Sequence, residues 1–140
     1  MKMAKELDPR VRGFLEASDR YAVLATIDSD GRPLQAVVWY LVQGDSLLVN
    51  SLEGRRWPAN LRRDPRFGVT VEDGMDYVAL RGEAEVLHDP EQAQEDIAAM
   101  ARRYRPPEIA ERMIEHRFRP QRRVSFRLHP SVVTPHWGID

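Results

Sequence analysis

The sequence predicts a mainly β fold, in which six antiparallel strands form a small closed barrel with flanking helices. Three observations predict this fold class. Short apolar runs of strand length recur along the chain, several of them are separated by tight turns with Asp-Gly or Gly-Asp, and helical patterns are confined to a few segments. Closure into a barrel is favoured because it leaves no exposed sheet edges. A chain of this length, 1–140, is expected to be a single domain.

The first third of the chain predicts one helix followed by three strands. Residues 8–17 form an amphipathic pattern in which Asp8 can cap the helix and Pro9 occupies its first position. Glycines in the turns between the strands supply the positive φ angles that tight hairpins need. We therefore expect an antiparallel meander with strands over 21–27, 33–42 and 47–51.

The rest of the chain predicts a basic connector, three more strands and two helices. The connector, 50–66, reads NSLEGRRWPANLRRDPR and is expected to be helical from about 55 to 63. Gly82 lies inside a long strand and therefore predicts a bulge or a close backbone approach. The expected strands cover 67–72, 75–87 and 123–128. One helix is expected between Asp89-Pro90 and the break at Pro106-Pro107, and a second over 108–117.

Composition and charge exclude several kinds of site and partner. The net charge of −1 predicts no general attraction to nucleic acid, and the absence of cysteine excludes disulfides and thiolate metal sites. The four histidines have no partners at metal-ligand spacing, so no metal site is expected. No apolar run is long enough to span a membrane, and the first residues lack the apolar core of a signal peptide. A cytoplasmic location is expected.

The arginine-rich connector is the strongest candidate for a binding site. Gly54, Arg55 and Arg56 precede the expected helix, and a helix N-terminus with arginines beside it favours a bound anion such as a phosphate. The alternative is a solvated basic face that pairs with nearby carboxylates. Trp57 is either an aromatic surface beside the phosphate or a core residue, and the sequence leaves both readings open.

Catalytic side chains are not identifiable from the sequence. There is no phosphate-binding loop, no GxGxxG and no nucleophile elbow, and no serine has an adjacent base. Tyr40 and Tyr77 are candidate proton donors only because tyrosine is protonated near neutral pH. An enzyme of this composition would rely on a cofactor, with the protein supplying position and electrostatics.

Taken together, these segments resemble the pyridoxamine 5′-phosphate oxidase-like split β-barrels, above all the short members that bind flavin mononucleotide (FMN) or the deazaflavin factor 420. The matching segments are YAVLATIDSDGRP, VVWYLVQGDSLLVNS, GRRWPANLRRDPRFGVTVED, YVALRGEAEV and RRVSFRLHPSVV. The resemblance implies a six-stranded antiparallel split barrel of the FMN-binding type. It also implies a homodimer with two cofactor sites at the subunit interface.

The resemblance also implies which residues contact the cofactor. Asn50 and Ser51 would approach the phosphate or ribityl chain, and Arg55, Arg56 and the backbone up to Pro58 would hold the phosphate. The remaining implied residues would border the ring or belong to the motif: Gln35, Val37, Trp57, Asn60 and, from the other protomer, Tyr77.

Two departures from the family pattern narrow the expected activity. Trp57 stands where many relatives that bind factor 420 have a lysine, which leaves FMN open as the cofactor. The chain ends soon after the last expected strand, without the C-terminal segment with which true pyridoxamine-phosphate oxidases recognise substrate, so that activity is not expected. The leading hypothesis is an oxidoreductase that transfers hydride to or from a small molecule. The alternatives are a carrier or sensor that binds flavin or haem, and a module that binds anions or nucleic acid.

Overall fold

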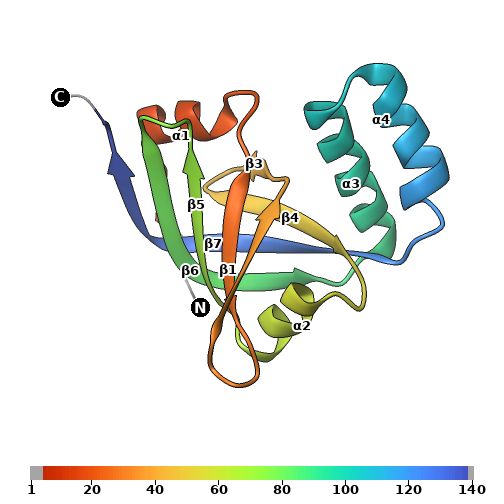
Figure 1. The fold of residues 1–140 in the computed structure, drawn as a ribbon, viewed down its shortest axis with the longest axis horizontal. Coiled ribbons are helices and arrows are strands. Elements are labelled where there is room, and N and C mark those ends of the chain that lie inside the picture. Colours follow the sequence, from red (N-terminus) through yellow and green to blue (C-terminus); the bar gives the residue numbers. More distant parts are fainter. Residues whose placement is uncertain (1–4, 139–140) are drawn as a thin grey trace.

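A computed structural model describes residues 5–138 of the chain. The strands are β1 (Ala22–Ile27), β2 (Pro33–Val38), β3 (Leu41–Gln43), β4 (Ser46–Leu52), β5 (Arg66–Glu72), β6 (Tyr77–Leu87) and β7 (Arg123–His136). The helices are α1 (Pro9–Glu16), α2 (Arg56–Arg63), α3 (Pro90–Tyr104) and α4 (Pro107–Met113), and α4 continues into a π-helix, η1 (Ile114–Phe118). We call α3, α4 and η1 together the helical insert, because they lie between β6 and β7 (Figure 1).

The strands form one antiparallel sheet in the order β2-β1-β5-β6-β7-β4-β3, which confirms the predicted fold class. The edge strands β2 and β3 are at opposite ends of this order, yet only Trp39 and Tyr40 separate them in the chain. Three residue steps span at most about 11 Å. The sheet must therefore curl until its two edges approach each other, as they do in a barrel.

The strand expected over 33–42 is wrong, because the chain divides it into β2 and β3 and so has seven strands rather than six. The break is at Tyr40, whose backbone groups bond to side chains of α3 and not to a neighbouring strand. Its N–H donates to the Tyr104 hydroxyl at 3.3 Å, and its carbonyl accepts from Arg103. The Tyr40 ring is fully buried, and its hydroxyl donates to the Leu15 carbonyl at 2.6 Å.

Other local predictions are confirmed or extended. Asp8 caps α1 by accepting from the Val11 N–H, and a register shift between β6 and β7 occurs at Gly82. A Cβ at Gly82 would lie 2.0 Å from the His129 carbonyl oxygen, so the close backbone approach requires glycine. The last strand was expected to end at 128 but continues to His136, because β6 supplies partners for it from Ser125 to His136.

Two apolar cores hold the structure together. The larger one fills the barrel and includes Tyr40, Trp57 and Phe126. The smaller one lies between the barrel and the helical insert, where Leu48 of β4 packs against Ile97 and the other apolar residues of the helices. The insert is therefore docked on the barrel, and the border between them is where a cleft forms. Among residues 5–138, no helix has the length and apolar character needed to cross a membrane.

Candidate functional site

A cleft of about 270 Å³ lies where the helical insert meets the barrel. Its barrel side consists of Val37 and Val38 at the end of β2, Trp39 after it, and Asn50 of β4. The wall has both apolar and polar character, since Asn50 is buried at 8% exposure while Val37 is 70% exposed. This combination of a few directed polar groups and an apolar surface is typical of small-molecule sites.

Four arginines line the same cleft and come from three separate parts of the chain. Arg55 precedes α2, Arg105 and Arg117 lie between β6 and β7 (after α3 and in η1, respectively), and Arg123 begins β7. The π-helix contributes Arg117 to this set, and π-helical turns are frequent at functional sites. The cleft is therefore cationic although the whole chain has a net charge of −1.

Arg123 is the buried member of this group, with 9% exposure. Its Nε donates to Asn50 Oδ1 at 3.0 Å, and its Nη1 donates to Gln121 Oε1 at 2.8 Å. Within the described part of the chain it has no carboxylate partner. Burial, with smaller contributions from the charges of Arg55 and Arg117, lowers the pKa of Arg123 to about 10. A buried cation without a counter-ion is costly, and a bound anion would relieve that cost.

A chain of hydrogen bonds orients Arg123 from behind. Asn50, which accepts from Arg123, donates through Nδ2 to Ser125 Oγ at 2.9 Å and to the Ala93 carbonyl. Ser125 in turn donates to Asp96 Oδ2 at 2.7 Å. The hydrogen bonds all run in one direction, from Arg123 to Asn50, from Asn50 to Ser125 and from Ser125 to Asp96. They connect a buried cation to a buried carboxylate and fix the orientation of the Asn50 amide. Asn50 therefore holds an arginine in the cleft.

Within residues 5–138, the arginines of the cleft have no carboxylate partner, unlike Arg56, Arg62 and Arg66 of the basic connector. The guanidinium groups of Arg55 and Arg117 make no hydrogen bond or ion pair with residues 5–138. In contrast, Arg62 pairs with Glu53 at 2.7 Å and Arg66 pairs with Asp64 at 2.7 Å. Donors that the folded chain leaves unused beside a cleft suit a bound oxyanion, for which the guanidinium fork has the right geometry.

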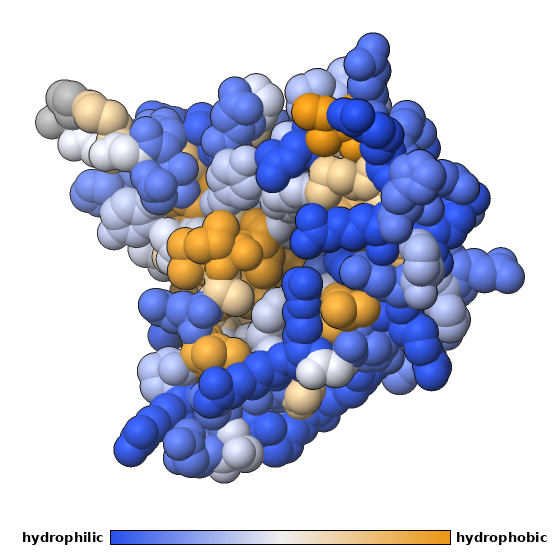
Figure 2. Space-filling model, turned by 45° about the vertical axis from the view of Figure 1, so that its right-hand side comes forward, coloured by the Kyte–Doolittle hydropathy of each residue, from blue (hydrophilic) through white to orange (hydrophobic). Residues whose placement is uncertain are grey.

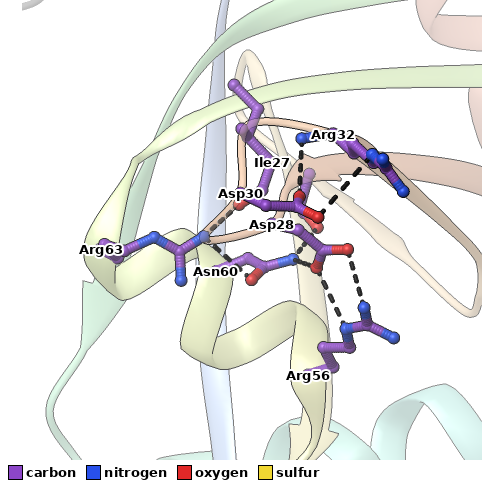
Figure 3. A network of polar contacts seen from close by, with 8 residues as sticks. Ile27, Asp28, Asp30, Arg32, Arg56, Asn60 and Arg63 are labelled. Atoms are coloured by element: carbon purple, nitrogen blue, oxygen red, sulfur yellow. Dashed lines mark hydrogen bonds and ion pairs between the residues drawn. The ribbon is translucent and has the colours of Figure 1, made fainter.

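The structure directs Arg55 and Arg56 to different surroundings. Arg56 forms a two-bond ion pair with Asp28, at 3.1 and 2.9 Å (Figure 3). It does not line the cleft. Asn60 is buried and donates through Nδ2 to Thr26 and to Asp28, so its amide supports the turn after β1. The carboxylate of Asp28 thus binds two of the residues predicted to contact a cofactor.

The remaining predicted site residues lie either in the protein interior or on the outer face of the sheet, and among them Trp57 also reaches the cleft. Ser51 and Pro58 are buried and do not line the cleft, and Ser51 Oγ has no hydrogen-bond partner within residues 5–138. Trp57 is 7% exposed and packs on Phe126 with ring centres 5.7 Å apart, while part of its surface reaches the cleft. Gln35 and Tyr77 line a separate hollow of about 450 Å³ on the outer face of the sheet.

The described residues offer no clear acid, base or metal ligand at the cleft. Tyr40 is enclosed in the barrel core, where burial raises the pKa of its hydroxyl, and Tyr77 stacks on His136 outside the cleft with ring centres 4.8 Å apart. Within residues 5–138, no group of three or more His, Asp or Glu side chains is arranged to hold a metal. The cleft can therefore bind and orient an anionic molecule, but it offers no obvious side chain for proton transfer.

Sequence reasoning missed three of the four cleft arginines: Arg105, Arg117 and Arg123. The first follows a helix, the second lies in an irregular helix and the third begins a strand, so no shared motif connects them. The only available signal was that each lies near a predicted element boundary, which is too general to select them. Their convergence depends on how the helical insert docks against β4 and β7.

Comparison with solved structures shows which proteins have this fold. The conserved hypothetical protein Rv2991 from Mycobacterium tuberculosis is 25% identical, with a TM-score of 0.77 over 99% of this chain and 90% of its own. An F420 reductase is 22% identical, with a TM-score of 0.69 over 91% of this chain and 98% of its own. HutZ, the haem storage protein from Vibrio cholerae, is 21% identical, with a TM-score of 0.68 over 96% of this chain and 98% of its own.

The family assignment rests on nearly the whole chain. A sequence model described as pyridoxamine 5′-phosphate oxidase matches residues 7–136. That range includes the barrel, the basic connector and the helical insert, which together form the cleft. The chain belongs to the pyridoxamine 5′-phosphate oxidase family.

Proposed function

We propose that this protein is a cytosolic, homodimeric oxidoreductase that binds FMN or factor 420 in the cleft and transfers hydride to or from a small molecule. The observation that carries the proposal is that Arg55 and the buried Arg123 line the same cleft. Neither of them has a carboxylate partner among residues 5–138. Both proposed cofactors contain a phosphate group, and phosphate in this setting forms strong charge-assisted hydrogen bonds.

The residues of the cleft fit the two parts of such a cofactor. Arg55 and Arg123 would hold the phosphate, and the apolar surface of Val37 and Val38 would border the ring. A flavin or deazaflavin supplies the hydride chemistry when bound. The protein's part is to hold the reactants in orientation and to keep water away from them. Asn50 maintains the direction of the Arg123 guanidinium through its own hydrogen bonds.

A titration with FMN and with factor 420 tests this proposal, and the different surroundings of Arg55 and Arg56 provide a matched pair of variants. We expect low-micromolar or tighter binding of one cofactor. Arg55→Ala should weaken it by about tenfold or more, because a charge-assisted hydrogen bond is lost. Arg56→Ala should change affinity less than about twofold, since this arginine belongs to an exposed ion pair with Asp28. Equal losses in both variants, or no binding of either cofactor, would contradict the proposal.

The homodimer is proposed on the basis of the outer sheet face. Apolar surface gathers in a recess with hydrophilic side chains around it (Figure 2). Exposed apolar residues of the barrel lie on adjacent strands, where Val23 of β1 is directly opposite Val37 of β2. Val132 of β7 and Tyr77 of β6 line the same hollow as Val23. Exposed apolar side chains gathered on one face of a sheet are typical of an interaction surface.

A charged substitution on this face tests the dimer. The double variant Val23→Asp/Val132→Asp should change the mass measured by light scattering from that of two chains to that of one, because burying two carboxylates in an apolar interface is costly. Ile109→Asp is the matched control, since Ile109 is similarly exposed at 39% but lies on α4. If the double variant remains dimeric, or if the parent protein is a monomer, the proposed interface is wrong.

A non-enzymatic carrier or sensor is the second candidate function. It is favoured by the lack of an acid or base among the described residues that line the cleft, and by the shared fold of HutZ, a haem storage protein. Binding of haem in preference to FMN and factor 420, without oxidation of reduced cofactor by a panel of quinones and enones, would support this candidate over the enzyme.

A further inference from the structure

Arg105 occupies a defined position at the cleft. It is the C-cap residue of α3, with an extended backbone, and Pro106 and Pro107 follow it. Its guanidinium carbon lies 5.3 Å from the centre of the Trp39 ring. Trp39 is itself stacked on Tyr104, with ring centres 5.2 Å apart and an angle of 9° between the rings. Because proline restricts the backbone on one side and the stacked rings support the side chain, Arg105 is presented to the cleft in a limited set of conformations.

The hydrogen-bonding capacity of Arg105 is largely unused. The only hydrogen bond of its guanidinium to residues 5–138 runs from Nη1 to the Tyr104 carbonyl at 3.3 Å, and it has no ion pair within that part of the chain. Arg102, one turn earlier on the same helix, forms a two-bond ion pair with Glu111 at 2.9 and 3.0 Å. A neighbouring arginine is therefore neutralised within the insert, while the one at the cleft is not.

The other three arginines of the cleft carry enough charge to neutralise the cofactor phosphate without Arg105. Arg55, Arg117 and Arg123 line the same cleft, and the charges of the first two help to lower the pKa of the third. Three positive charges already exceed the charge of a phosphate monoester such as that of FMN, which is about −1.5 to −2 at neutral pH. Arg123 lies over Phe118, with its guanidinium carbon 5.0 Å from the ring centre, whereas Arg105 lies over Trp39, next to Val37 and Val38. Arg105 is therefore not needed to neutralise the phosphate, and it lies beside the surface proposed to border the cofactor ring.

We propose that Arg105 binds a carboxylate of the substrate, which makes the substrate a small anionic molecule held beside the cofactor ring. This inference rests on the proposed function, because it is the cofactor phosphate that occupies the other arginines. The guanidinium fork of Arg105 can donate two parallel hydrogen bonds to a carboxylate, and Trp39 supports it from behind.

Benzoate and its neutral analogue benzamide are suitable probes, because they have nearly the same shape and differ in charge. The protein is first saturated with whichever of FMN and factor 420 it binds, and each probe is then titrated by calorimetry. We expect benzoate to bind at least about tenfold more tightly than benzamide. Arg105→Ala should remove this preference, whereas the matched control Arg102→Ala should retain it. The cofactor affinity should change less than about twofold in both variants.

The outcomes separate this inference from the proposed function. No preference for benzoate in the parent protein, or an unchanged preference in Arg105→Ala, overturns the inference. A loss of factor 420 affinity in Arg105→Ala with unchanged FMN affinity also overturns it, because Arg105 would then bind a carboxylate of the cofactor. If neither cofactor binds the parent protein, the proposed function fails. A preference for benzoate in the cofactor-free protein, lost in Arg105→Ala, would still support an anion site at Arg105.

Discussion

Replacing Trp57 by alanine should lower the free energy of unfolding by about 3–5 kcal/mol, the range for removing a large aromatic side chain from a core. Trp57 is 7% exposed, belongs to the barrel core and packs on Phe126. Its truncation would leave a cavity between α2 and β7 that neighbouring side chains cannot fill without strain. Denaturant unfolding of the parent and the variant measures the difference.

The same substitution separates the two readings of Trp57 that the sequence left open. Trp57→Phe is the control, because it keeps an aromatic ring on Phe126 and removes less volume. We expect this variant to retain most of the stability and to bind the cofactor within a few fold of the parent. A loss below about 1 kcal/mol in Trp57→Ala, with a strong loss of cofactor affinity, would show that Trp57 acts as a ligand and contributes little to the core.

Arg123→Met should remove most of the cofactor affinity while changing the stability of the unliganded protein by less than about 2 kcal/mol. Two effects on stability oppose each other. The substitution removes a buried cation that has no carboxylate partner within residues 5–138, but it leaves Asn50 Oδ1 without the Arg123 donor. Affinity has no such compensation, since the phosphate loses a charge-assisted bond. Thermal melts without and with cofactor measure the stability and the effect of cofactor binding, respectively. Adding cofactor should raise the melting temperature strongly in the parent protein but not in Arg123→Met.

Arg103→Met should have the opposite effects to Arg123→Met, with lower stability and nearly unchanged cofactor binding. Arg103 is half-buried, and its guanidinium donates to the backbone carbonyls of Leu15, Ala17 and Tyr40, away from the cleft. Removing it takes one donor from each of three carbonyls, of which those of Leu15 and Tyr40 keep a second donor. This variant should therefore be less stable yet still be stabilised by cofactor. If Arg123→Met retains the cofactor-dependent rise in melting temperature, the phosphate does not bind at Arg123.

Local features of the fold were predictable because they depend on backbone geometry and near neighbours. The turn glycines Gly31 and Gly74 have φ angles of 86° and 95°, as tight turns require. Asp8 caps α1, and Gly82 marks the irregularity between β6 and β7. Alternating apolar residues likewise indicated most of the strands. The break at Tyr40 was not predictable, because it depends on side chains of α3 more than sixty residues later in the chain.

By itself the sequence determined a mainly β domain with a basic connector after β4, and it supported the family resemblance. Only the tertiary structure decided which cations face the cleft. Arg55 and Arg56 are adjacent in the chain, yet Asp28 from the turn after β1 pairs with Arg56 alone. Arg123 reaches the same cleft from the start of β7. The physical reason is that an arginine remains available for a ligand only if no carboxylate pairs with it. Which carboxylates come close depends on the packing of segments that are distant in the sequence, and no local pattern contains that information.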